Sequence, residues 1–259
     1  MPAQATPTSA PFQSPTISIL SGLFLVFLGI AAALALAFFI VPASQYLSLS
    51  NYLQIITAFT GSAVFLWLYF RHGRGTGLLY ATGAFALWGV ADIAWYAAVL
   101  LGVGTITFPS LIDMGFVAAI LLLSSAYNRI YPRKQVRGQI LLAVLLLMLV
   151  VPLAILATGG ITDKALMILL YFFACGSLII TGLNHSLPEH PMALAGTLLF
   201  AISFMIYPLR ETFFSGNPYL SVIGTFVAAG FSLIVLGILP TKQGPTRTEP
   251  VPAEPPRAP

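Results

Sequence analysis

The chain has 259 residues, of which 58% are hydrophobic and only 7% are charged. Soluble globular proteins carry about a quarter charged residues, so this composition is typical of a protein that is surrounded by lipid. No Asp, Glu, Lys or Arg precedes Arg71, which leaves the first part of the chain without charges to cover an apolar core in water. The formal net charge of +4 comes from scattered basic residues that form no basic stripe, and we predict no nucleic-acid partner.

Eight apolar runs follow one another along the chain, each near the roughly 20 residues that a membrane-spanning helix needs. Backbone groups in lipid must be hydrogen-bonded within their own segment, so each run is predicted to be helical. The tails 1–16 and 240–259 are rich in Pro and polar residues and are predicted to be disordered, which leaves 17–239 as an all-α transmembrane domain. The predicted spans are 17–41, 52–70, 77–101, 110–130, 138–158, 165–183, 192–209 and 218–239.

Basic residues predict how the bundle is oriented, because Lys and Arg gather on the cytoplasmic side of a membrane. If both termini share one side, the opposite side holds only Lys164 and Arg210 of the 11 basic residues. We therefore expect a protein of the cytoplasmic membrane with both termini in the cytoplasm. The basic residues on that side, some of which are expected to meet anionic lipid headgroups, are Arg71, Arg74, Arg129, Arg133, Lys134, Arg137, Lys242, Arg247 and Arg257.

A weak internal repeat relates the two halves of the chain. Residues 92–96 and 115–123 resemble residues 203–207 and 225–233, at an offset of about 110 residues. Such an offset spans four predicted helices, so it predicts two parallel four-helix repeats. Chance similarity between apolar segments is the alternative explanation.

Two carboxylates, Asp92 and Asp113, fall inside predicted spans, where a charged group is costly and usually functional. Trp88, Trp95 and Tyr96 lie on the same helical face as Asp92, at spacings of three or four residues. This face is a candidate ligand pocket, in which aromatic rings attract a ligand and Asp92 orients it or takes up a proton. The alternative is a contact between helices in which Asp92 has a structural role only.

Asp113 has a local explanation, because Phe108, Pro109 and Ser110 before it are typical of the start of a helix. Proline is tolerated in the first turn, serine caps it, and an acidic residue is favourable at the positive end of the helix dipole. Arg210, near the end of the seventh predicted span, is expected to neutralise Asp92 or Asp113 if its helix packs beside theirs.

Known catalytic and cofactor-binding patterns are absent from the sequence, so we predict no catalytic residue and no cofactor. His185, Glu189 and His190 have side chains that can bind metals, but Pro188 interrupts the helix that would align them. We interpret this segment as a solvated turn and predict no metal site. Cys175 lies in an apolar run and is interpreted as a small packing residue.

Three short patterns follow one another in the sequence. An Asp-containing helix end covers 91–95, a Gly-bearing turn covers 101–104, and a Phe-Pro-Ser-x-x-Asp helix start covers 108–113. In this order they resemble the multi-pass sensory input region at the N-terminus of many bacterial and archaeal diguanylate cyclases and histidine kinases. The sequence departs from that pattern at 114–116, where Met-Gly-Phe follows the second Asp. The positions that match the family pattern are Asp92, Phe108, Pro109, Ser110 and Asp113.

This resemblance implies a sensory module that binds a small ligand, or responds to the membrane, near Asp92 and Asp113. The module is expected to pass a change in helix packing to a cytoplasmic partner or a second copy of the chain. The residues after 240 are too few for a kinase or cyclase domain, so we expect a stand-alone sensor. Two other function classes stay open. One is a membrane-embedded lipid hydrolase similar to the lysoplasmalogenases, which also place an Asp deep in a helix, and the other is a small proton-coupled transporter.

Overall fold

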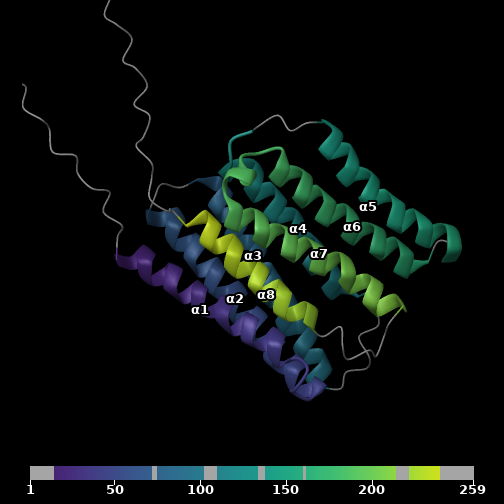
Figure 1. Ribbon diagram of the computed structural model, residues 1–259, viewed down its shortest axis with the longest axis horizontal. Coiled ribbons are helices and arrows are strands. Elements are labelled where there is room, and N and C mark those ends of the chain that lie inside the picture. The colour runs from purple at the N-terminus through teal and green to yellow at the C-terminus, as the bar shows by residue number, and fades with distance from the viewer. Residues whose placement is uncertain are drawn as a thin grey trace, which may run out of the picture.

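The computed structural model describes residues 15–71, 75–101, 110–133, 138–159, 162–213 and 222–239. Within these ranges the chain is all-α, which confirms the all-α part of the predicted fold class (Figure 1). Most of the two predicted tails lies outside the described residues. The elements are α1 (Pro15–Ala37), α2 (Ala43–Arg71), α3 (Thr76–Leu100), α4 (Leu111–Ile130), α5 (Gly138–Gly159), α6 (Asp163–Leu183), the 3-10 helix η1 (Leu187–Glu189), α7 (Pro191–Phe213) and α8 (Val222–Ile238).

Six of these helices, α1 to α4, α6 and α7, are long and apolar enough to cross a membrane, and the described parts of α5 and α8 form two shorter apolar helices. Large apolar side chains also cover the outside of the bundle. Leu36 is 78% exposed and Phe173 65% exposed, which is favourable in lipid and unfavourable in water. The chain is therefore a multi-pass membrane protein.

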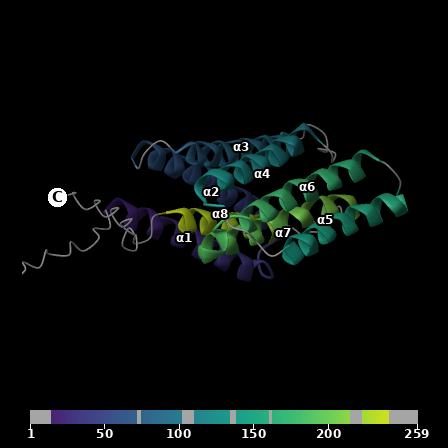
Figure 2. The same ribbon diagram turned by 90° about the horizontal axis from the view of Figure 1, so that it is seen from above.

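Six helices form a ring in which each helix packs against two others, in the order α2, α3, α4, α6, α7, α8 and back to α2. The two remaining helices lie outside this ring. α1 packs on α8 and α2, and α5 packs on α6, so that α1 and α5 occupy opposite edges of the molecule (Figures 1 and 2). The ring order differs from the chain order only where α5 is bypassed.

Aromatic side chains fill the middle of the ring. Trp88 on α3 is almost fully buried, and its ring centroid lies 4.2 Å from that of Phe204 and 4.9 Å from that of Phe200, both on α7. Phe116 on α4 and Phe231 on α8 contact the same indole, at 4.7 and 5.3 Å. Four helices therefore meet at one tryptophan, which fixes where the polar residues beside it must lie.

Small residues bring α7 and α8 into backbone contact. A Cβ atom added at Gly196 would lie 2.6 Å from the carbonyl oxygen of Gly230 and 2.7 Å from the amide nitrogen of Ile234. A Cβ atom at Gly237 would collide with Ala193. Close approach at small residues is a common means of packing helices in membranes.

α2 begins at Ala43, well before the predicted start at 52. The helix already includes the polar residues that precede 52, and the hydroxyl group of Ser48 donates to the carbonyl oxygen of Ser44 at 3.2 Å. Asn51 and Gln54 are buried on the inner face of this helix. Because hydropathy cannot distinguish a polar loop from polar residues that face the interior of a bundle, the start of α2 was misplaced.

Adjacent helices in the chain run in opposite directions, so the bundle has two distinct ends. The end at which α2, α4 and α6 finish and α3 and α7 begin carries Arg71, Arg129 and Arg133, and we name it the basic end. Gly77 at the start of α3 approaches Ile130 at the end of α4, and a β-bridge joins Arg133 to His185, which follows α6. Asp92 and Asp113 lie nearer the other end, which we name the far end.

Candidate functional site

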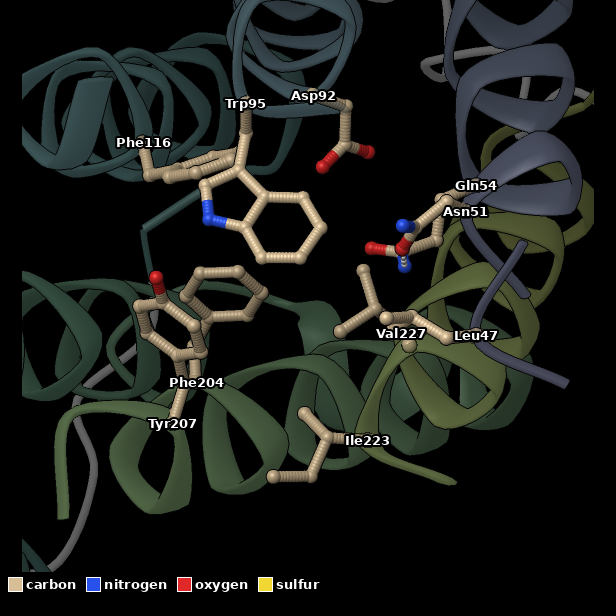
Figure 3. Close-up of a pocket in the computed structure, with 11 residues that line it drawn as sticks. Leu47, Asn51, Gln54, Asp92, Trp95, Phe116, Phe204, Tyr207, Ile223 and Val227 are labelled. Carbon is tan, nitrogen blue, oxygen red and sulfur yellow. Dashed lines mark hydrogen bonds between the residues drawn. The ribbon is translucent and has the colours of Figure 1, made fainter. Parts of the chain in front are cut away.

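A small pocket lies inside the helix ring, in the half nearer the far end (Figure 3). Its volume of about 50 Å³ is enough for a few water molecules or one small ion, and too little for a drug-sized ligand. Five helices supply its walls: α2, α3, α4, α7 and α8. The lining residues are Leu47, Asn51, Gln54, Asp92, Trp95, Phe116, Phe204, Tyr207, Ile223, Gly224 and Val227.

Amide side chains of α2 form one polar wall of the pocket. Asn51 and Gln54 are spaced three residues apart, so they lie on the same helical face, and Gln54 Nε2 donates to Asn51 Oδ1 at 3.5 Å. Gly224 of α8 lies opposite, where an added Cβ atom would collide with the Gln54 amide and lie 3.1 Å from Ser50 Oγ. The glycine therefore leaves the space that these polar side chains occupy.

The carboxyl group of Asp92 enters the pocket from α3 and faces the two amides across it (Figure 3). Asp92 is only 8% exposed, and its Oδ2 atom has no hydrogen-bond partner among the described residues. The indole N–H of Trp88 interacts with the Asp92 carboxyl group without making a hydrogen bond of good geometry. The Nδ2 atom of Asn51 is also buried and unpartnered within the described part of the chain.

Unpartnered buried polar atoms are rare, because each costs about 1–3 kcal/mol when nothing replaces the water it has lost. Here the Asp92 and Asn51 side chains line one small cavity. A water molecule or a small polar ligand in this cavity would satisfy them together. The arrangement is therefore that of a binding site for a small polar species.

Aromatic rings form the opposite wall of the pocket. Trp95 comes from α3, Phe116 from α4, and Phe204 and Tyr207 from α7, where the last two rings lie 5.6 Å apart. Figure 3 shows these four rings gathered on the side of the cavity away from the amides. Aromatic faces attract cations, and a carboxylate beside them attracts cations more strongly. The electrostatic character of the pocket therefore favours a positively charged occupant.

Asp113, the second predicted intramembrane acid, is buried but fully engaged at the start of α4. Its Oδ2 atom accepts hydrogen bonds from the backbone N–H and the hydroxyl group of Ser110, both at 2.7 Å, and its backbone N–H donates to Ser110 Oγ at 3.4 Å. This is a capping box, and it confirms the predicted helix start. The hydroxyl group of Tyr171 on α6 donates to Asp113 Oδ1 at 3.0 Å.

The predicted site residues divide between several environments. Asp92 and Trp95 line the pocket. Trp88 lies among the aromatic side chains at the centre of the helix ring. Tyr96 lies on the exposed side of α2 and α3, where its hydroxyl group donates to that of Tyr52 at 3.1 Å. Phe108 and Pro109 lie outside the described residues, as does the side chain of Arg210. Ser110 and Asp113 form the cap.

Sequence reasoning missed Asn51, Gln54 and Tyr207 as members of the pocket. A signal for the first two was present, because two amide side chains three residues apart at the edge of an apolar run fit one face of a helix. Tyr207 was noted only as part of the repeat, and nothing local marks it as a partner of Asp92.

Comparisons of the chain with protein-family models, with curated proteins and with solved structures returned no match. The fold and the pocket define a class: a multi-pass α-helical membrane protein with a small carboxylate-bearing pocket inside its helix ring. The resemblance to sensory input regions stays a prediction.

Proposed function

We propose that the chain is a membrane-embedded binding module whose pocket at Asp92 takes up a small monovalent cation, either a metal ion or a small protonated amine. The observation that carries this proposal is the buried, unpartnered Oδ2 atom of Asp92 in a small cavity. A cation would satisfy that oxygen and would be held by the side-chain oxygens of Asn51 and Gln54. The Asn51 Nδ2 atom donates, so it needs an acceptor such as a water molecule bound beside the cation.

Charge and size both support a small cation as the ligand. No Lys or Arg is among the described residues that line the pocket, so an anion would meet the Asp92 carboxylate without a compensating charge. The aromatic wall adds a favourable cation–π contribution of about 0.5–2 kcal/mol. The cavity volume of about 50 Å³ is far below that of pockets for drug-sized ligands, which favours a small ion.

The helices that a bound ligand would contact are the basis for the sensory part of the proposal. An occupant at Asp92 touches α2 and α3 on one side and α7 and α8 on the other, so binding favours the arrangement in which these helices are closest. We propose that a cytoplasmic partner or a second copy of the chain detects this change. In the topology that we propose, all eight helices cross the membrane and the basic end, with both termini, faces the cytoplasm.

A transporter is the second candidate, and the helix order favours it. α2, α3 and α4 occupy the same places in one half of the ring as α6, α7 and α8 in the other, as two parallel four-helix repeats would require. The outer helices match less well, because α1 packs mainly on α8 whereas α5 packs on α6. The pocket lies between the two halves, which is where transporters built from repeats bind their substrates. A transported cation would occupy the same site.

Cation binding can be tested by thermal unfolding of the purified full-length protein at constant ionic strength. The probes are the chlorides of sodium, potassium, ammonium, methylammonium and tetramethylammonium. We expect saturable stabilisation by at least one small cation, of about 2.7 kcal/mol at a hundred times its Kd. Asp92→Asn should abolish this stabilisation, and Gly224→Ala should weaken it by filling the pocket. Asp163→Asn, which removes an exposed carboxylate at the far end, is the matched control and should respond like the wild type.

Two outcomes would overturn the proposal. The first is an equal response of the wild type and Asp92→Asn to every probe. The second is equal stabilisation by tetramethylammonium and methylammonium, since a site in so small a cavity should discriminate between ions by size. Flux of the bound cation into liposomes distinguishes a transporter from a binding module. A transporter carries the cation across the membrane and loses this flux in Asp92→Asn, whereas a binding module gives no flux in either protein.

A further inference from the structure

A second and larger pocket lies at the basic end, where the chain leaves α4 and α6. Its volume is about 550 Å³, within the range of ligand pockets in proteins. Its walls are mostly polar, and they come from segments far apart in the sequence. The side chains that the argument uses are those of Asn128, Tyr131, Arg133, Thr181, Asn184 and His185.

The main chain holds these two segments together. Arg133 and His185 form an antiparallel β-bridge, and the backbone N–H of Ser186 donates to the carbonyl oxygen of Pro132 at 2.9 Å. These interactions place the turn after α4 beside the turn after α6. Backbone hydrogen bonds thus hold together the two turns that frame the pocket.

The interpretation of this segment as a solvated turn is wrong for His185, which is buried and is oriented by the end of α6. Its Nδ1 atom lies 2.7 Å from the carbonyl oxygen of Thr181, and because a carbonyl oxygen only accepts, Nδ1 carries the proton and donates. This hydrogen bond fixes the plane of the imidazole ring and leaves its second nitrogen outside the interaction.

Tyr131 provides the independent sign of a missing ligand. The residue is only 5% exposed, and its hydroxyl group is buried without a hydrogen-bond partner among the described residues. Its ring is held in place by the rings of His190 at 4.9 Å and Tyr127 at 5.6 Å. Tyr131 lines the pocket, and a ligand atom that reached this buried hydroxyl group would supply the hydrogen-bond partner that it lacks among the described residues.

The charges of this pocket point to an anion. Arg133 is exposed and supplies a guanidinium group, and no acidic side chain is among the described residues that line the pocket. The neighbouring Arg129 is engaged elsewhere, since it donates to the carbonyl oxygen of Ser125 at 3.0 Å and its guanidinium carbon lies 4.1 Å from the centre of the Tyr80 ring. The neutral side chains around Arg133 are hydroxyl and amide groups, which donate to phosphate oxygens.

We propose that the pocket between the α4 and α6 turns binds a phosphate group, in which the guanidinium of Arg133 pairs with the phosphate and the hydroxyl group of Tyr131 donates to one of its oxygens. The phosphate belongs either to a small phosphate ester in water or to the headgroup of an anionic lipid, because the basic end lies where water and headgroups meet. The proposal does not depend on the Asp92 pocket, which lies in the other half of the bundle.

The experiment has two arms, both on the purified full-length protein. In the first, inorganic phosphate and glycerol 3-phosphate are titrated and the shift in melting temperature is recorded. In the second, native mass spectrometry measures how much phosphatidylglycerol stays bound compared with phosphatidylcholine. Arg133→Gln removes the charge, Tyr131→Phe removes only the unpartnered hydroxyl group, and Arg71→Gln removes a basic-end charge outside the pocket as the matched control.

We expect Arg133→Gln to lower the affinity about tenfold and Tyr131→Phe about threefold to tenfold, with Arg71→Gln close to the wild type. Without ligand, Tyr131→Phe should melt no earlier than the wild type, because the hydroxyl group that it removes has no partner to lose. Loss of glycerol 3-phosphate binding in the variants identifies a soluble ester, and loss of retained phosphatidylglycerol identifies a lipid headgroup.

Two results would overturn the proposal. One is an unchanged response of both Arg133→Gln and Tyr131→Phe in both arms. The other is an equal loss in Arg71→Gln, which would show that the basic end attracts phosphate by its overall charge and not through this pocket.

Discussion

Asp92 and Asp113 are the same residue type, both are buried, and both lie in the half of the bundle nearer the far end, yet their surroundings differ completely. Asp113 accepts three hydrogen bonds, two from Ser110 and one from Tyr171. Asp92 has an oxygen atom without a partner among the described residues, and it lines a cavity. The start of α4 is thus complete without a ligand, whereas the pocket is not.

This contrast teaches that an acidic residue inside a membrane protein is not informative by type alone. What separates a structural carboxylate from a binding one is whether the fold already supplies its hydrogen-bond donors. The difference can be tested through stability, because removing a satisfied group and removing an unsatisfied one have opposite consequences.

The largest expected effect comes from Asp113→Ala. This change removes the capping box of α4 and leaves the buried hydroxyl group of Tyr171 without its Asp113 partner. We expect the free energy of unfolding to fall by about 2–4 kcal/mol, measured by denaturation of the purified protein in detergent micelles. Asp163→Ala is the matched control, because Asp163 also lies in a first helical turn behind a hydroxyl cap but is exposed, and its loss should be below about 1 kcal/mol. Equal losses would contradict the structural role of Asp113.

A smaller effect is expected from Tyr171→Phe, which keeps the ring and removes the hydrogen bond to Asp113 Oδ1. The free energy of unfolding should fall by about 1–2 kcal/mol in the same assay. In the Asp113→Ala background the same substitution should have a smaller effect, because the two side chains interact directly. Full additivity of the two losses would show that this hydrogen bond contributes nothing.

The smallest effect on stability is expected from Asp92→Leu. An unpartnered polar group is replaced by an apolar one, so the free energy of unfolding in the absence of ligand should change by less than about 1 kcal/mol or should increase. The melting temperature without added cations measures this. A loss as large as that of Asp113→Ala would remove the distinction between the two carboxylates.

The role of Asp113 was predictable because helix caps are local. Ser110 and Asp113 are three residues apart, and the sequence pattern alone indicates which group donates to which. The apolar runs were equally informative about the helices, since a span is marked by its own residues. α2 is the exception, because its first turns carry polar residues that face the interior.

The surroundings of Asp92 were not predictable in this way. Asn51 lies about forty residues earlier in the chain and Tyr207 more than a hundred residues later, so their meeting depends on the ring order of the helices. The same holds for Tyr131 and His185, which the packing of α4 on α6 and the backbone contacts between the two turns bring together. Local patterns name candidate residues, but they do not show which of them lack partners.

The packing of α1 on α8 has a consequence for how the protein is made. The ribosome delivers α1 first and α8 last, so the first helix enters the membrane long before its main neighbour exists. The ring also closes only through α8, which contributes Ile223, Gly224 and Val227 to the pocket. A nascent chain that stops before α8 lacks these three residues of the pocket wall and leaves the ring of helices open between α7 and α2.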